Sequence, residues 1–378
     1  MRILGERIVP RPGHLRPLPV RIEVAAATDL VAAELERALE RERAERPSEA
    51  AVHAEFALHL ADAHEPCREQ VLALRVLCRT AADRRQEEEA VGFGRRAAAL
   101  ALQLQELDLW AAAMVEWAEA HRGYPASAAD AAALHLEMIA RGAAWDRPEV
   151  ARAGAEALAD HALEDDDPER AVELAWRALD YLDAEAEADP NSDAPGDAAA
   201  HARRRAVLSG LLAAGLARLG LADAAEQALE PPPDASPAIL LLLRAAAALA
   251  MAGAGRPERI LDGWPMERAP ADVLAAVAGE RLEEAELAVR AGIWMARALR
   301  LARLPREARA YAQSALELAR RGGDRALVRQ ARTTLEEAVL GDPVALALPV
   351  PGALREAVRA IAYTVEHGHL RPLHAPPS

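Results

Sequence analysis

The 378-residue sequence contains no lysine, and all 45 of its basic residues are arginine. This absence excludes a Schiff-base lysine, a lysine nucleophile and the lysine of a phosphate-binding P-loop. Acidic residues outnumber the arginines, which gives a formal net charge of −15. Because neutralised phosphates supply most of the affinity for nucleic acids, so acidic a chain is a poor general binder of nucleic acid or anionic membrane.

Aromatic residues make up only 3% of the chain, although 52% of its residues are hydrophobic. Leucine and alanine must therefore build the core. Such a core suits close packing of helices better than a β-sandwich, which requires aromatic and β-branched residues. The composition predicts an all-α protein.

Cysteine and long apolar runs are also scarce. Cys67 and Cys78 are the only cysteines, which argues against a disulfide framework and favours a reducing compartment. The first residues lack the apolar core of a signal peptide. The most apolar run, Ala238–Met251, is too short to span a bilayer and contains Arg244. We expect a soluble, cytoplasmic protein.

The length fits two or three ordinary domains or one extended repeat array. Residues 1–26 predict an extended basic N-terminal arm, and residues 27–188 predict a first set of helical repeats. A polar loop at 189–197 precedes a second set of repeats at 198–340. Residues 341–378 predict a capping helix followed by a proline-rich tail.

The clearest repeat unit is Ala288–Leu340, which reads as two and a half helices. The first helix ends near Leu304, and Pro305 opens the second at a position that needs no N–H. Gly322 and Gly323 end the second helix, and Asp324 caps the next. Small and aliphatic residues spaced three and four apart form a stripe on one face of the second helix, so that a neighbouring helix can approach closely. These residues are Ala308, Ala312, Ala315, Leu316 and Leu318.

This unit resembles a tetratricopeptide repeat (TPR), a helical hairpin of about 34 residues that stacks into a solenoid. Trp294 and Ala296 loosely represent the aromatic and glycine landmarks of the first helix in that family. Residues 148–188 repeat the stripe of the second helix, at Ala171, Ala175, Ala178 and Leu179. The chain is most similar to the long Ala/Leu/Arg-rich repeats found beside bacterial signalling ATPases and caspase-like peptidases. The resemblance implies an α-solenoid of irregular TPR-like hairpins.

In this family the first helix of each unit lines a concave groove that accepts peptides or helices. The resemblance implies that one set of residues faces this groove in the C-terminal unit, with two more joining from the following helix: Arg290, Ile293, Arg297 and Arg300, then Arg329 and Arg332. The corresponding face of 148–164 carries Glu156, Asp160 and Glu164. A groove that is basic at one end and acidic at the other would orient a partner, and arginine forks bind carboxylates well. Equally, these arginines can simply pair with neighbouring glutamates.

The expected function is a non-catalytic scaffold, adaptor or regulatory subunit that binds a protein or peptide in a bacterial signalling or defence pathway. The partner would be another protein, such as a protease or a signalling ATPase, and not a nucleic acid or a membrane. An alternative is a regulatory substrate or inhibitor of a caspase-like protease. Cleavage in a tail or loop, at 10–20, 189–197 or 365–374, would then switch its state.

An identical hexapeptide, GHLRPL, occurs near both ends of the chain. Its residues are Gly13, His14, Leu15, Arg16, Pro17 and Leu18, and again Gly368, His369, Leu370, Arg371, Pro372 and Leu373. The repetition is either a coincidence in an Arg/Leu/Pro-rich composition or a linear motif that one partner recognises twice.

No catalytic or metal-binding pattern is complete, so we expect no enzyme, cofactor or metal. The best candidate for a metal site is a group of histidines and cysteines that lie close together in the sequence: His53, His59, His64, Cys67 and Cys78. On one helix His53 and His64 would stand about 16 Å apart, and the chain has no paired CxxC or HExxH spacing. His135 and Glu137 match half of a zinc deaminase signature whose PCxxC half is missing. Ser209 lacks the preceding glycine of a nucleophile elbow.

Overall fold

The computed structural model describes residues 24–62, 65–122, 128–188, 195–232, 235–256, 264, 268–279, 282–323, 325–340, 358 and 361. Within these residues the chain is helical and contains no strand, which confirms the all-α class. Both copies of the GHLRPL hexapeptide lie outside the described residues, as do most of the expected N-terminal arm and C-terminal tail. No helix in the described part of the chain is both long and apolar enough to cross a membrane.

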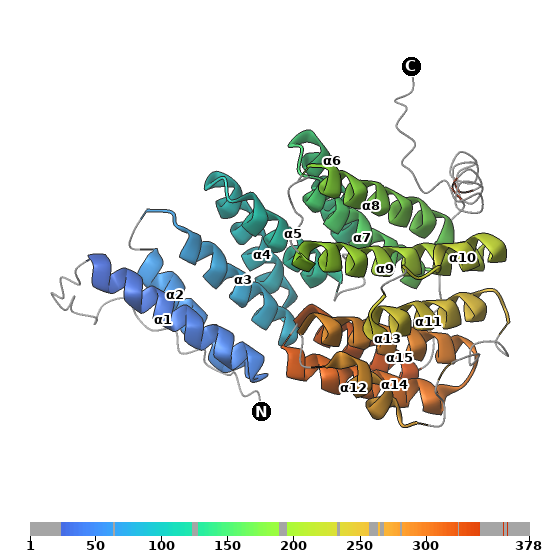
Figure 1. The fold of residues 1–378 in the computed structure, drawn as a ribbon. Helices are drawn as coiled ribbons and strands as arrows, with labels where there is room; N and C mark the ends of the chain where they lie inside the picture. The colour runs from blue at the N-terminus through green and yellow to red at the C-terminus, as the bar shows by residue number, and fades with distance from the viewer. Residues whose placement is uncertain are drawn as a thin grey trace, which may run out of the picture.

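The described helices follow one another along the chain and pack mainly on their neighbours in sequence (Figure 1). The first eight are α1 (Val24–Arg43), α2 (Pro47–Ala61), α3 (Arg68–Asp83), α4 (Glu87–Gln103), α5 (Leu107–Arg122), α6 (Ala128–Ala144), α7 (Pro148–Glu164) and α8 (Pro168–Ala188). The others are α9 (Pro195–Arg218), α10 (Ala222–Ala228), α11 (Pro237–Gly253), α12 (Pro270–Ala278), α13 (Leu282–Leu301), α14 (Pro305–Gly322) and α15 (Arg325–Leu340). This order of packing is that of a helical solenoid.

The odd-numbered helices other than α11 form the inner layer of the solenoid, and α11 packs closely on both α9 and α13. Each odd-numbered helix from α1 to α13 also packs on the next odd-numbered helix, whereas the even-numbered helices before α12 pack mainly on their chain neighbours. The inner layer continues from α9 to α13, where Arg203 and Glu283 form an ion pair at 3.0 Å, and it ends at α15. Helices that are far apart in the sequence and do not form a hairpin, such as α7 and α13, can therefore present side chains to the same space inside the layer.

One type of turn recurs eight times between these helices. In each, a single residue adopts positive φ: Glu45, Arg85, Gln105, Asp146, Asp166, Gly220, Gly255 and Arg303. The N–H of the residue after it donates to a carbonyl five residues back, as from Arg46 to Arg41 at 2.9 Å. This is the Schellman ending of a helix. Because the same turn joins successive helices, the hairpins repeat a similar geometry along the chain.

Alanine lets the paired helices approach closely. The fourth position of the helix that follows the turn is alanine in six cases, and each of these side chains is buried: Ala50, Ala90, Ala151, Ala171, Ala225 and Ala308. The predicted stripe of α14 lies in the core at Ala312, Ala315 and Leu316, and Leu318 is partly buried against it. The small-residue pattern was therefore a correct guide to packing.

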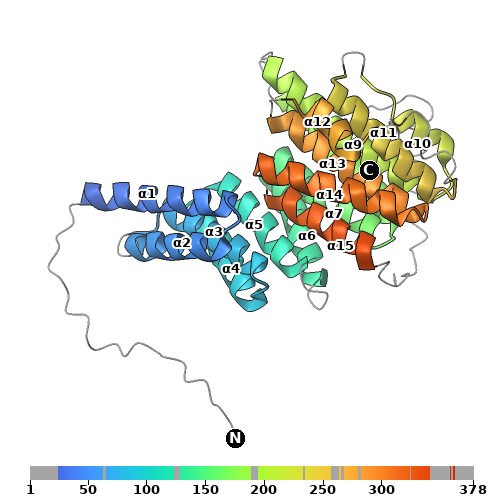
Figure 2. The same ribbon diagram turned by 90° about the horizontal axis from the view of Figure 1, so that it is seen from below.

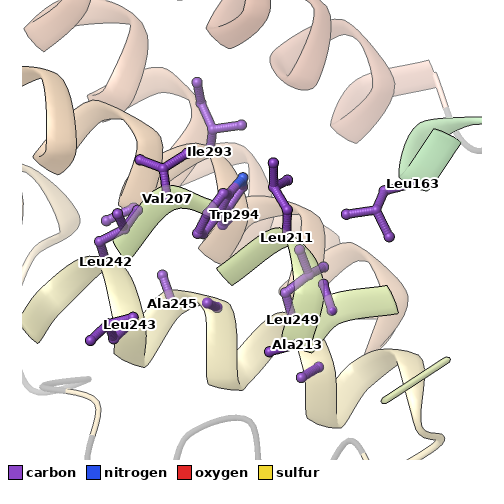
Figure 3. Close-up of a cluster of buried hydrophobic side chains, with 14 of the residues drawn as sticks. Leu163, Val207, Leu211, Ala213, Leu242, Leu243, Ala245, Leu249, Ile293 and Trp294 are labelled. Carbon is purple, nitrogen blue, oxygen red and sulfur yellow. The ribbon is translucent and has the colours of Figure 1, made fainter. Parts of the chain in front are cut away.

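Two large hydrophobic clusters fill the solenoid, and they meet in α6 and α7. The first extends from α1 to α5 and ends at Met138 and Val150. The second begins at Ile139 and continues through the last helices to Val358 and Ile361. Figure 3 shows the centre of the second cluster, where Trp294 of α13 lies among aliphatic side chains of α9 and α11.

Two boundaries differ from the sequence prediction. Helix α1 begins at Val24, so the last three residues of the predicted extended arm, 24–26, are helical. Helix α12 was not predicted, because Pro270 resembles a loop boundary. Pro270 instead occupies the first turn of α12, where its missing N–H costs nothing.

The C-terminal helices return towards the start of the chain. In both ribbon views α14 and α15 lie beside one end of α1 (Figures 1 and 2). Arg320 of α14 forms an ion pair with Glu45, in the turn after α1, with Nε and Oε1 2.7 Å apart. The inner layer therefore encloses a central space.

Candidate protein-binding surface

The central space contains a cavity of about 380 Å³ between α5, α7, α13 and α15. Its apolar wall includes Val115, Trp294 and Leu327. Its polar wall consists of charged and amide or hydroxyl side chains: Glu119, Glu156, Asp160, His161, Glu164, Arg290, Arg329, Gln330 and Thr333. The cavity thus gathers residues from helices that are far apart in the sequence.

The predicted acidic residues of α7 and basic residues of α13 pair with each other beside this cavity. Arg297 of α13 donates to Asp160 at 3.2 Å and also to Glu164, both on α7. Arg290 lies 3.6 Å from Glu156, measured between Nη1 and Oε1. Of the two alternatives that the sequence left open, the structure therefore shows the second for Arg290 and Arg297, which pair with carboxylates and do not form a separate basic end of a groove. The two helices lie opposite each other in the inner layer, so their charges pair.

Two further expectations about individual residues need correction. Ile293 was expected to face the groove, but its side chain has 0% exposure and lies in the hydrophobic core. Its helix, α13, is covered by α11, α12, α14 and α15, so most of its faces are buried. Arg300 donates to Glu337 of α15 instead of pointing into the cavity. Arg332 is half-buried on α15 and is not part of the cavity wall.

Arg329 differs from the other arginines of the site. It reaches the cavity from α15, and no described carboxylate forms an ion pair with it. Its Nε is buried without a hydrogen-bond partner among the described residues, as are the Nε atoms of Arg297 and Arg300, so the missing ion pair is what distinguishes Arg329. Arg329 therefore contributes a positive charge that the cavity wall does not neutralise directly.

A network of buried ion pairs fixes the inner helices beside the cavity. Arg79 of α3 donates to Glu42 at 2.7 and 2.8 Å and to Glu116 of α5 at 2.5 Å. Arg75 adds two parallel hydrogen bonds to Glu116, at 2.9 and 2.8 Å. Burial alone would lower the pKa of Arg79, but its hydrogen bonds to Glu42 and the charge of Glu116 raise it above its ordinary value. This network holds α1, α3 and α5 in register.

The cysteines and histidines do not form a metal site within the described residues. His53 forms a hydrogen bond with Glu34 at 2.7 Å, and His64 lies outside the described part of the chain. Cys78 is buried on α3. Burial and the charge of Glu116 raise the pKa of its thiol to about 12, although Arg329 and two other guanidinium groups act in the opposite direction. Such a thiol is a poor nucleophile and a poor metal ligand.

His135 and Glu137 of α6 do not converge on a site. The ring of His135 is fully buried and meets the ring of His161 edge to face, with centroids 5.1 Å apart. Glu137 instead accepts a hydrogen bond from Arg141 at 2.5 Å on the exposed side of the helix. Their spacing of two places them on different faces of α6, so the partial deaminase signature has no structural counterpart here.

Sequence reasoning named Arg329 but missed the other residues that α5 and α15 contribute to the cavity, such as Glu119 and Thr333. Their position depends on the curvature of the whole solenoid, for which no local pattern exists. Comparison with protein-family models and with curated proteins found no match. The physical description of the cavity therefore rests on this chain alone.

Proposed function

We propose that this chain is a solenoid of TPR-like repeats that binds a protein or peptide in the cavity between α5, α7, α13 and α15. Helical hairpins with alanine at the close contacts and an inner layer of first helices support the TPR type. In this proposal the chain acts as a non-catalytic scaffold, adaptor or regulatory subunit. A cytoplasmic partner in a bacterial signalling or defence system, such as a protease or signalling ATPase, fits the resemblance to repeats found beside such proteins.

The observation that carries the proposal is Arg329. Arg290 of the cavity wall and Arg297 beside it already bind carboxylates, whereas the Arg329 guanidinium has no ion-pair partner among the described residues. An acidic side chain of a partner would accept charge-assisted hydrogen bonds from it. Trp294 and Leu327 lie in the same wall and would supply apolar contacts. The partner we propose therefore presents an acidic residue next to an apolar one.

The paired charges around Arg329 contribute to selectivity. Glu156, Asp160 and Glu164 would repel a partner that placed its negative charge on the α7 side of the cavity. The acidic residue of the partner is therefore directed towards α15. This arrangement selects a binding orientation, although the predicted gradient of charge along the groove does not exist.

Comparative capture from lysates of the host organism tests the proposal. The bait proteins are the native chain, Arg329→Gln and a matched control, Arg309→Gln. Arg309 is an exposed residue of the outer helix α14, so the control makes the same change in charge away from the cavity. We expect one partner to be retained by the native chain and by Arg309→Gln and lost by Arg329→Gln. A partner retained equally by all three proteins would contradict a role for the cavity.

The same partner also tests the protease alternative. If the captured protein cleaves the chain at 10–20, 189–197 or 365–374 and is released afterwards, the chain is its regulatory substrate. If it binds without cleavage and the chain stays intact, the adaptor function is supported. Incubation of the purified pair followed by mass spectrometry of the chain distinguishes the two outcomes.

A further inference from the structure

We propose that the solenoid is a clamp, which closes through charged contacts between its first and last helices and opens by a hinge at α6 and α7. The inference concerns the protein by itself, so it holds or fails independently of any partner. Its basis is a contrast between the contacts that join the two ends and the contacts that hold each half together.

The two ends meet through ion pairs at the tips of successive turns. Glu45, in the turn after α1, pairs with Arg320 of α14 at 2.7 Å. Arg85, in the turn after α3, lies 3.9 Å from Glu336 of α15, measured between Nη2 and Oε1. Glu45 and Arg85 occupy the same position of the repeated turn, and each side chain reaches from its own hairpin to one of the last helices. Two equivalent turns of the first half thus contact two consecutive helices of the second half.

Among the described residues, no hydrophobic cluster joins the two ends of the solenoid. Residues of α1 to α5 belong to one hydrophobic cluster, and residues of α13 to α15 belong to the other. The clusters adjoin only in α6 and α7, where Met138 belongs to the first and its neighbour Ile139 to the second. Apolar packing therefore connects the halves on one side of the cavity, and charged side chains connect them on the other.

Such a closure is weak and sensitive to salt. The side chain of Arg85 is 83% exposed and that of Arg320 is 44% exposed, so water and ions screen both pairs. An exposed ion pair changes an equilibrium by about two- to fivefold. Two pairs together then shift the equilibrium towards the closed form by roughly tenfold, and breaking them shifts it back by the same factor.

Opening would change access to the cavity. Val115 and Glu119 line it from α5 in the first half, whereas Leu327 and Arg329 line it from α15 in the second. Movement about α6 and α7 separates these two walls. The proposed binding site therefore widens when the ion pairs at the ends break.

Distances between two spin labels, measured by double electron–electron resonance, test the clamp. The labels are placed on Val52→Cys of α2 and Val339→Cys of α15, which are both exposed, in a Cys67→Ser background. Cys78 is buried and stays unlabelled. We expect two populations of distance. The ratio of the longer to the shorter should rise about two- to fivefold in Glu45→Arg, and similarly in Arg320→Glu.

Three comparisons make the result decisive. The double variant Glu45→Arg with Arg320→Glu restores the pair with its charges exchanged, and should restore the native ratio. Raising the salt from about 0.05 M to about 1 M should favour the longer distance in the native chain. Arg303→Glu reverses a charge at another turn of the same type, for which no described ion pair exists, and should change nothing.

A single narrow distance that neither salt nor charge reversal alters would show a rigid ring and overturn the proposal. Equal opening in the single and double variants would show that closure does not depend on this pair, which would also overturn it. Circular dichroism of each variant confirms that the exposed substitutions leave the helices folded. No partner is present in these measurements, so their failure is distinct from failure of partner capture.

Discussion

Replacement of Gly142 by alanine tests how closely the hairpins pack. Gly142 lies in the last turn of α6, against the first turn of α7. A Cβ atom at this position would lie 2.5 Å from the backbone nitrogen of Ala151 and 2.9 Å from its Cα. The atoms it meets are backbone atoms of Ala151 and its Cβ, which is fixed to the backbone, so no side chain can rotate away. Helices α6 and α7 would have to separate.

The size of the effect follows from two opposing terms. The closest approach is about 0.9 Å shorter than the 3.4 Å at which ordinary contact begins. Overpacking of this kind costs about 1–3 kcal/mol, and the upper end applies because backbone must move. Alanine also favours a helix over glycine by about 1 kcal/mol. We therefore expect Gly142→Ala to lower the free energy of unfolding by about 2 kcal/mol.

Gly92→Ala is the matched control. A Cβ atom at Gly92 of α4 would meet nothing within 4 Å, so only the helix preference acts and the variant should gain up to about 1 kcal/mol. Urea denaturation followed by far-UV circular dichroism compares both variants with the native chain. Hydrogen exchange should show the loss of protection centred on α6 and α7. A Gly142→Ala protein as stable as Gly92→Ala would refute the close packing of this hairpin.

Three further predictions concern buried or partly buried charges and thiols. Arg79→Met should cost about 3–5 kcal/mol in urea denaturation, because it leaves the buried carboxylate of Glu42 without its partner and removes one of the two arginines that bind Glu116. A change below about 1 kcal/mol would show that the inner network is not coupled. Because burial raises the pKa of Cys78 to about 12, an aromatic disulfide reagent near neutral pH should modify Cys67 first and Cys78 only after unfolding; equal rates would contradict its burial. A hydrogen bond with His53 is the main reason that the pKa of Glu34 is lowered from 4.5 in the folded chain. The Glu34 carboxylate therefore stabilises the fold above pH 4.5, and this contribution is lost as the pH falls through the lower pKa of the folded state. Glu34→Gln should therefore flatten the acid side of the stability profile, and an unchanged acid side would contradict this assignment.

Much of the fold was predictable because local signals agree with the final packing. Pro305 and the glycines at 322 and 323 mark the bounds of α14, and the alanine spacing identifies its buried face. Helix α12 was missed because Pro270 is compatible with both a loop and the first turn of a helix. The positive φ of Gln105 and Asp146 had no sequence signal, since neither residue is glycine.

The site was less predictable, because it depends on the curvature of the solenoid. Sequence reasoning selected Asp160 and Arg297 as members of two separate patches, but the structure brings them into one ion pair across 137 residues. Ile293 was assigned to the groove because its helix was treated as having one free face. Only the packing of four other helices around α13 shows that this side chain is buried.

Photo-crosslinking in the host organism tests the central claim most directly. A photoreactive amino acid at Thr333, an exposed residue of the cavity wall, should crosslink one partner, and the same probe at Arg309 on the outer layer should not. The crosslink at Thr333 should disappear when Arg329→Gln is added. A partner that crosslinks only from Arg309, or from Thr333 regardless of Arg329, would contradict binding in the cavity.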